Sequence, residues 1–213
     1  LASAEYIDFK AILPYIDFVN IMSYDMGNAP KHHAALYRSE NSGWMTADAA
    51  VEAHLKAGVP ASKLVMGMPF YGRGGDGYPN FLDFNKVGHT KEYSECWDEV
   101  AKVPYLANKA GKLVFGYENP RSLAIKCQYI LKQKLLGGMY WDYDGDNEQG
   151  DLRRTVYEGL IEQKPFFPAI PVMVYFGLRQ VLSTIKVPLS SGRLVLRILI
   201  GIPSFLTGKI ASS

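Results

Sequence analysis

The chain has 213 residues, which is enough for one domain with a substantial core or for part of a larger domain. Hydrophobic residues make up 48% of the chain and charged residues 21%, which is typical of a globular protein. The net charge of +2 argues against a dedicated nucleic-acid-binding protein, because such a protein carries a basic stripe. The two cysteines, Cys96 and Cys127, are too few for a disulfide framework, and we expect them to pack as small apolar groups.

The first half of the chain alternates between apolar runs and one amphipathic segment. Residues 16–24 are rich in Val, Ile and aromatic residues, which predicts a buried strand that ends at the polar Asp25. Residues 46–57 predict a helix that Thr46 caps and Gly58 ends. Residues 64–71 form a second apolar run, and a glycine-rich turn follows it.

The alternation resumes after residue 117. Residues 120–135 predict an amphipathic helix that begins with proline and ends at a Gly-Gly pair. Residues 139–143 predict a third strand, and residues 149–163 a closing helix with apolar side chains on one face. Short apolar strands that alternate with helices indicate βα units, a parallel sheet and the α/β class.

The segment between residues 73 and 117 interrupts this alternation. At about 45 residues it is long for a connection between a strand and a helix. It also contains many aromatic side chains, including Tyr78, Trp97 and Phe115. We therefore expect it to fold as a small inserted subdomain.

The last 48 residues, 166–213, differ in composition from the rest of the chain. They contain five basic residues and no acidic residue, and two apolar runs of about 13 residues that are short of the roughly 20 needed for a membrane span. Three interpretations stand: a basic amphipathic segment at a membrane interface, an added packing element, or a stretch unrelated to the fold, which we favour. Membrane contact is the less favoured of these possibilities.

Polar or aromatic side chains occur where each of the three predicted strands ends. Ligands bind at the carboxyl ends of the strands in parallel barrels and sheets. These side chains are therefore candidates for a binding site, and they are Tyr24, Asp25, Tyr71, Arg73, Trp141 and Asp142.

The same positions carry four motifs in order. Residues 22–25 (Met-Ser-Tyr-Asp) resemble the M-x-Y-D of the sixth strand of family 18 glycoside hydrolases, and residues 67–73 (GMPFYGR) resemble the G-x-P-x-Y-G-R of the seventh strand. Residues 137–141 (GGMYW) are similar to the G-G-x-x-W of the eighth strand, and residues 144–147 fit the turn after it. Residues 117–122 resemble the Y-D-x-x-S segment, with Glu where Asp is usual.

The resemblance covers roughly residues 6–163 and implies a fold. It implies a (β/α)8 TIM barrel of which this chain supplies strands six to eight, with a small α+β insertion before the last strand. On this basis residues 1–165 form the C-terminal part of a chitinase-type catalytic barrel, with the insertion at about 73–117, and residues 166–213 form the tail.

The resemblance also implies a reaction and a set of site residues. The family cleaves β-1,4 bonds next to N-acetylglucosamine with retention, and the N-acetyl group of the substrate acts as the nucleophile. By position, Tyr24 would hydrogen-bond the acetamido oxygen and Asp25 would hold the distorted sugar. Trp141 would form the floor beneath that sugar, and Tyr71 with Arg73 would line neighbouring subsites. The substrate-binding positions implied are Met22, Tyr71, Arg73 and Trp141.

The proton donor of the family is absent from these residues. It lies in a D-x-x-D-x-D-x-E motif on the fourth strand, and no such motif occurs here. Asp144, Asp146 and Glu148 match three positions of that motif, but the glycine and asparagine residues among them indicate a turn into a helix. We interpret these acids as a solvated cluster at a helix start, and we expect this chain alone to be inactive.

Two other functions remain open: a chitinase-like lectin that binds carbohydrate without cleaving it, and an endo-β-N-acetylglucosaminidase acting on N-glycans. We expect an N-acetylglucosamine oligosaccharide or chitin as partner, with no cofactor. We also expect no metal, because His32, His33 and His54 have no ligand-like partners. No signal-peptide pattern is present, although the resemblance suggests a secreted or cell-envelope protein.

Overall fold

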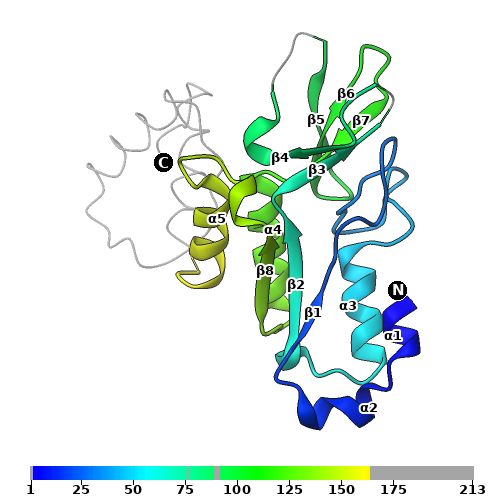
Figure 1. The fold of residues 1–213 in the computed structure, drawn as a ribbon, viewed down its shortest axis with the longest axis vertical. Coiled ribbons are helices and arrows are strands. Elements are labelled where there is room, and N and C mark those ends of the chain that lie inside the picture. Colours follow the sequence, from blue (N-terminus) through cyan, green and yellow to red (C-terminus); the bar gives the residue numbers. More distant parts are fainter. Residues whose placement is uncertain (1, 76, 89–91, 164–213) are drawn as a thin grey trace, which may run out of the picture. The chain divides into compact units, whose positions relative to one another are not determined.

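A computed structural model describes residues 2–75, 77–88 and 92–163 (Figure 1). The predicted tail at 166–213 lies outside the described residues, so its three interpretations stay predictions. None of the helices within the described ranges has the length and hydrophobicity needed to cross a membrane.

Three parallel strands form the first sheet. They are β1 (Val19–Ile21), β2 (Leu64–Pro69) and β8 (Gly137–Trp141), and β2 lies between the other two. The predicted order of strand, helix and strand is therefore present, and the α/β class is correct. β8 begins two residues before the predicted strand, because Gly137 and Gly138 pair with β2 and do not end the preceding helix.

Helices cover one side of this sheet. The longer ones are α3 (Ala47–Lys56), α4 (Pro120–Lys132) and α5 (Asp151–Leu160). As predicted, Thr46 caps α3, and its side chain accepts a hydrogen bond from the backbone of Ala49. The short helices are α1 (Ala2–Tyr6) and α2 (Phe9–Ile12), with 3-10 turns at Leu13–Tyr15, Ala61–Lys63, Phe84–Lys86 and Tyr143–Gly145.

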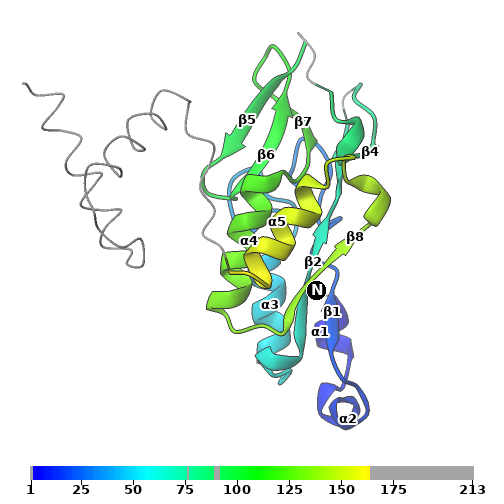
Figure 2. The same ribbon diagram turned by 90° about the vertical axis from the view of Figure 1, so that its left-hand side faces the viewer.

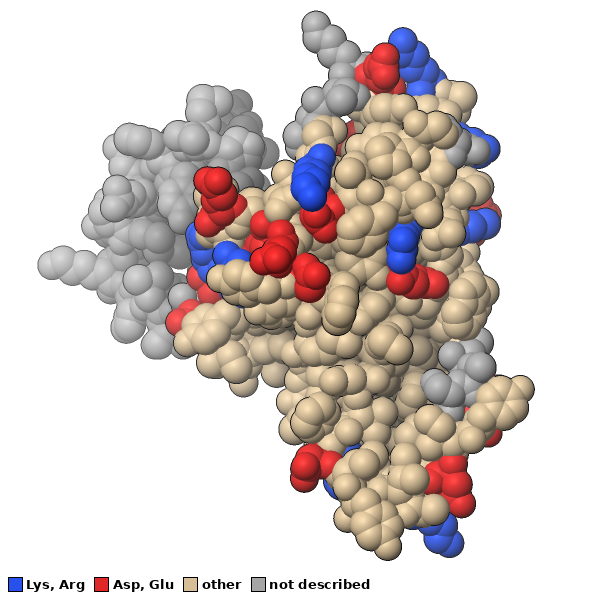
Figure 3. Space-filling view, viewed as in Figure 1, with Lys and Arg blue, Asp and Glu red and all other residues tan. Residues whose placement is uncertain are grey.

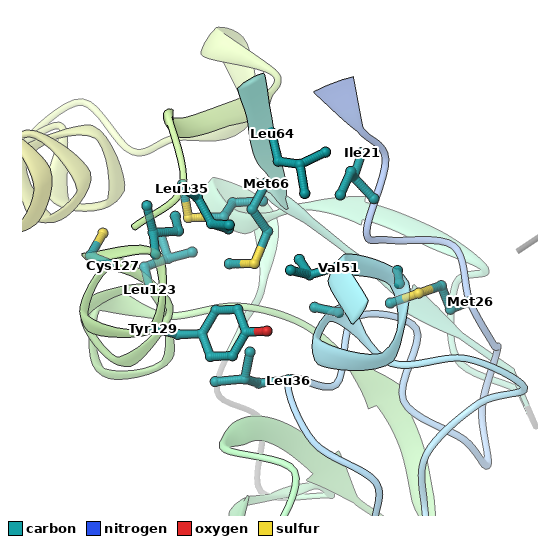
Figure 4. Close-up of a cluster of buried hydrophobic side chains, with 14 of the residues drawn as sticks. Ile21, Met26, Leu36, Val51, Leu64, Met66, Leu123, Cys127, Tyr129 and Leu135 are labelled. Atoms are coloured by element: carbon teal, nitrogen blue, oxygen red, sulfur yellow. The ribbon is translucent and has the colours of Figure 1, made fainter. Parts of the chain in front are cut away.

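The main core lies between the parallel sheet and these helices (Figures 2 and 4). Alternate residues of β2, Leu64 and Met66, point to the helices, as the period of two requires. They meet Val51 of α3 and Leu123 of α4 in one buried cluster. Cys127 is buried there too, as predicted, and burial raises the pKa of its thiol to about 12.

The segment between β2 and α4 forms a second, antiparallel sheet. Its strands are β3 (Tyr71–Gly74), β4 (Phe81–Asp83), β5 (Ser94–Asp98), β6 (Val103–Ala107) and β7 (Leu113–Gly116), in the order β4-β3-β7-β6-β5. Within the described part of this segment the only helix is the 3-10 turn at Phe84–Lys86, so the predicted α+β composition needs correction to antiparallel β. The aromatic side chains explain this, because Tyr78 and Tyr117 pack on Phe115 across the face of the sheet.

The two sheets are joined at Phe70, the only residue between β2 and β3. Its ring stacks on Tyr140 of β8 with centroids 4.4 Å apart, and its backbone N–H donates to the carbonyl oxygen of Trp141 at 2.6 Å. Tyr71 and Arg73 therefore belong to β3 of the second sheet and not to the end of the second parallel strand. Both residues are therefore part of the antiparallel sheet.

Candidate active site

The residues after β1 run along the end of the parallel sheet. Ser23 is buried, and its hydroxyl donates to the carbonyl oxygen of Gly67 in β2 at 2.7 Å. Because side chains alternate along an extended segment, Met22 and Tyr24 lie on the side away from this bond. Met22 is 70% exposed and Tyr24 is half-buried. Both are therefore accessible to a ligand at the carboxyl edge of the sheet.

Gly67 provides the space for the Tyr24 ring. A Cβ at position 67 would lie 2.8 Å from a ring carbon of Tyr24 and 2.7 Å from the carbonyl oxygen of Ile21. A side chain there would displace either the ring or the strand. The sequence motif contained this glycine, but only the structure shows that the absence of a side chain at position 67 leaves space for the Tyr24 ring.

Asp25 forms an ion pair with Arg73. The Arg73 Nε and Nη2 atoms donate to the two carboxylate oxygens of Asp25 at 2.7 and 2.9 Å, which is the strong bidentate geometry. Asp25 has a φ of 57°, in the left-handed region that Asp tolerates better than most residues. The guanidinium of Arg73 thus lies on Asp25, and its role in lining a neighbouring subsite stays a prediction.

Tyr71 packs beside the ion pair of Asp25 and Arg73. Only 4% of its surface is exposed, so it faces its neighbours more than a ligand. Its ring meets Tyr24 edge-on at 6.0 Å and Phe81 at 4.9 Å, and the Arg73 guanidinium carbon lies 5.3 Å from the Tyr71 ring centroid. Burial and the nearby charge of Asp25 raise the pKa of Tyr71, which keeps its hydroxyl protonated as a donor to Asp25.

These contacts determine the charge of Asp25. Burial opposes its ionised form, but contacts with His33, Arg73 and Tyr71 outweigh burial and lower the pKa of Asp25 well below its usual range. Burial, and then the charge of Asp25, raise the pKa of Tyr24. The site therefore presents a carboxylate beside a protonated phenol near neutral pH.

Trp141 lies at the same carboxyl edge, on the other side of β2. It is the last residue of β8, pairs with Pro69 in register, and is 56% exposed. The peptide bond between Trp141 and Asp142 is cis. Asp142 is exposed, and its side chain accepts a hydrogen bond from the backbone of Gly145. The indole is thus an exposed apolar surface at the edge where Tyr24 and Asp25 lie.

The acidic cluster after β8 lies at a helix start, as the sequence indicated, but it is not fully solvated. Asp146 is buried and accepts hydrogen bonds from the backbone of Leu152 at 3.0 Å and of Arg153 at 2.9 Å, which caps α5. Acidic side chains gather on the face drawn in Figure 3. The N-terminal backbone donors of α5 explain why Asp146 is buried, and this role leaves it unsuited to donate a proton to a substrate.

No group of three or more His, Cys, Asp or Glu side chains in the described ranges has an arrangement that could hold a metal ion. His33, for which the sequence predicted no role, instead lies against Asp25. Its Nδ1 is 3.7 Å from Asp25 Oδ1. No local pattern marks it, because residues 26–32 separate the two positions in the chain.

Taken together, parallel βα units with polar and aromatic groups at their carboxyl edge define an α/β scaffold with a candidate ligand-binding edge. The family model for glycosyl hydrolases family 18 matches residues 2–146. The chain belongs to family 18 of the glycosyl hydrolases, as the motifs indicated.

Individual relatives agree with this assignment. The chain is 31% identical to chitinase A1 of Niallia circulans over 188 residues, a match that covers 70% of this chain and 27% of that protein. It is 30% identical to chitinase B of Serratia marcescens, with 70% and 44% covered. It superposes on chitinase ChiW of Paenibacillus sp. with a TM-score of 0.66 and 32% identity, covering 75% of this chain and 21% of ChiW. The chain thus spans less than half the length of these relatives.

Proposed function

We propose that this chain is part of a chitinase and supplies strands six to eight of its (β/α)8 barrel as β1, β2 and β8. The complete protein would hydrolyse β-1,4-linked N-acetylglucosamine polymers. One observation carries the proposal: Tyr24, Asp25 and Trp141 lie at one carboxyl edge of a parallel sheet, in a chain that belongs to family 18. The relatives named chitinases support chitin as the substrate class.

In the proposed mechanism the substrate supplies its own nucleophile, and the stereochemistry is retained. The Tyr24 hydroxyl, whose raised pKa keeps its proton, donates to the acetamido oxygen and positions it to attack the anomeric carbon. The Asp25 carboxylate, oriented by Arg73, holds the sugar in its distorted shape. Trp141 forms the apolar floor beneath the ring.

A separate protein segment would supply the proton for the leaving oxygen. The D-x-x-D-x-D-x-E motif is absent from the sequence. Glu148, the best apparent substitute for its glutamate, lies in the turn before α5, and Asp146 caps that helix. We infer that the general acid belongs to the part of the relatives that this chain does not match. The lectin and the N-glycan endoglycosidase remain weaker alternatives, because the relatives described above are chitinases.

The first test concerns the missing acid. The 213-residue chain alone is expected to show no hydrolysis of a fluorogenic chitotrioside. Turnover by the purified chain at a rate that Glu148→Gln abolishes would show that the acid lies within it, and this part of the proposal would then fail.

The second test concerns Tyr24. In the complete enzyme, Tyr24→Phe removes the proposed donor to the acetamido oxygen and is expected to lower kcat by about 100-fold or more, the usual effect of losing one such donor. Tyr129→Phe is the matched control. It also deletes a tyrosine hydroxyl near a carboxylate, because Tyr129 donates to Asp48 at 2.7 Å, but it does so between two helices of the core. Near-normal turnover in Tyr24→Phe would remove Tyr24 from the mechanism.

A further inference from the structure

Two adjacent histidines, His32 and His33, are buried in the loop between β1 and α3, and each faces a different carboxylate. The His32 Nε2 lies 3.1 Å from Asp98 of β5, and its ring meets Tyr105 at 5.5 Å. The His33 ring instead faces the candidate site. The pair therefore offers two buried imidazoles of equal exposure in different surroundings.

His33 lies between two members of the site cluster. Its Nδ1 is 3.7 Å from Asp25 Oδ1, and its ring centroid is 5.4 Å from that of Tyr71. The distance to Asp25 is longer than a hydrogen bond, and the ring is only 1% exposed. Neither ring nitrogen has a partner at hydrogen-bond distance among the described residues. An imidazole with one N–H therefore has Asp25 as its acceptor within reach.

The backbone of the loop fixes His33 at this point. The backbone N–H of Met26, the residue after Asp25, donates to the carbonyl oxygen of His33 at 2.9 Å. The buried Lys126 of α4 donates to the carbonyl oxygen of Ala34 at 2.6 Å and also pairs with Glu118. Positions 33 and 34 are thus tied to the strand end on one side and to a core helix on the other. The His33 ring has little freedom to move away from Asp25.

Burial and two nearby cations keep the His33 ring neutral. Burial is the largest effect and lowers the pKa of His33, and the cations Lys126 and Arg73 act in the same direction. Asp25 opposes them, but the balance lies toward the neutral ring. Tyr71, which packs on the ring, stays protonated because its pKa is raised. A neutral imidazole carries a single N–H, so the nitrogen that holds it decides whether His33 supports Asp25.

We propose that His33 is a positioning residue: its neutral ring carries the proton on Nδ1 and supports the Asp25 carboxylate at Oδ1, the oxygen to which Arg73 Nε also donates. Three neighbours then hold the carboxylate, while 43% of the Asp25 side chain stays exposed for the substrate. The inference rests on the proposed function only in that Asp25 acts on the sugar.

The first experiment reads the tautomer in the unaltered 213-residue chain. The ring 15N chemical shifts of His33 at pH 7 are expected to show a protonated Nδ1 and an unprotonated Nε2. In Asp25→Asn the shift of Nδ1 is expected to change, whereas the shifts of His32 stay the same. A proton on Nε2, or a doubly protonated ring, would overturn the proposal. This measurement needs no catalysis, so it decides the role of His33 even if Tyr24→Phe shows that the proposed function is wrong.

The second experiment compares the two histidines in the complete enzyme. His33→Leu is expected to lower kcat about tenfold, because Asp25 loses one of its three polar neighbours, and to move the acid limb of the kcat/KM profile to higher pH. His33→Asn, which retains a side-chain N–H, is expected to recover part of both effects. His32→Leu removes an equally buried ring that faces Asp98 and is expected to leave the acid limb in place.

These variants also separate positioning from general support of the fold. Equal effects of His33→Leu and His32→Leu on the acid limb would assign His33 a merely structural role and overturn the proposal. If His33→Leu fails to fold, the comparison of His33→Asn with His32→Asn takes its place, with a smaller contrast in the acid limb expected in the same direction.

Discussion

The two sides of the candidate site are built in different ways. Beside β1 and β3, Asp25 is held by Arg73 and Tyr71, and the rings of Tyr24 and His33 pack on Tyr71. Beside β8, the exposed Trp141 indole is positioned mainly by its own backbone, which pairs with Pro69 and accepts from Phe70. The first side is an arranged electrostatic cluster, and the second is an exposed apolar surface.

The difference follows from what each group has to do. A carboxylate that acts in a chosen direction needs partners that fix its charge and orientation before the substrate arrives. An aromatic platform offers a flat surface to a sugar ring and needs only to be held at the correct place. We therefore expect substitutions on the first side to affect turnover and substitutions on the second side to affect binding.

The largest effect is expected on the Asp25 side. In the complete enzyme, Arg73→Lys replaces a bidentate guanidinium with a single point charge and is expected to lower kcat/KM by about 30-fold, or roughly 2 kcal/mol, mainly through kcat. Arg153→Lys is the matched control, because Arg153 also lies beside a carboxylate, Asp146, and over an aromatic ring, Tyr143. Steady-state kinetics on a soluble oligosaccharide would measure both. Equal losses in the two variants would show that the effect of Arg73→Lys does not depend on its contact with Asp25.

A smaller effect is expected on the Trp141 side. Trp141→Ala removes the exposed ring and is expected to raise KM about tenfold, or roughly 1.4 kcal/mol, with kcat less affected than in Arg73→Lys. Trp141→Phe is expected to recover part of the loss. Trp44→Ala, which deletes another exposed indole in the loop after β1, serves as the control and is expected to leave KM unchanged. A fall in kcat with constant KM for Trp141→Ala would show that the indole does more than support the sugar.

The smallest effect concerns stability and pH. Burial lowers the pKa of both His32 and His33 in the folded chain, so the unfolded chain binds more protons below its ordinary histidine pKa of about 6.5. Folding stability is therefore fully present above that value and is lost as the pH falls from about 7 toward the lowered pKa values. The melting temperature, followed by circular dichroism between pH 7 and 5, is expected to fall.

The same titration sharpens the contrast between the two sides. His33→Leu is expected to reduce the pH dependence of the melting temperature, because it removes one of the buried neutral rings. Trp141→Ala adds and removes no titrating group and is expected to keep the original dependence. An unchanged slope in His33→Leu would mean that His33 is not held neutral in the fold.

Several elements were predictable from local patterns. The apolar runs located the three parallel strands within a few residues, and the capping residue Thr46 marked the start of α3. The motifs also identified the family and named Tyr24, Asp25 and Trp141 as candidates. These features depend on neighbours in the sequence, so the sequence carries them directly.

Local patterns did not predict the change of sheet after β2 or the contacts between distant residues. Residues 64–71 read as one apolar run, yet the chain changes sheet at Phe70, and Tyr71 and Arg73 join the antiparallel insertion. The pairing of Arg73 with Asp25 spans 48 positions of the chain. Pairing across sheets depends on register and packing, which no local periodicity records.

By itself, the sequence determined the alternation of strands and helices, the family, and which side chains end the strands, because composition and motif order express these properties residue by residue. Only the tertiary structure decided how those side chains act on one another. It placed Arg73 on Asp25, gave Tyr24 its space over Gly67, and brought His33 to the carboxylate. The physical reason is that the charge state, burial and orientation of a side chain depend on the residues around it in space, and the fold determines which residues those are.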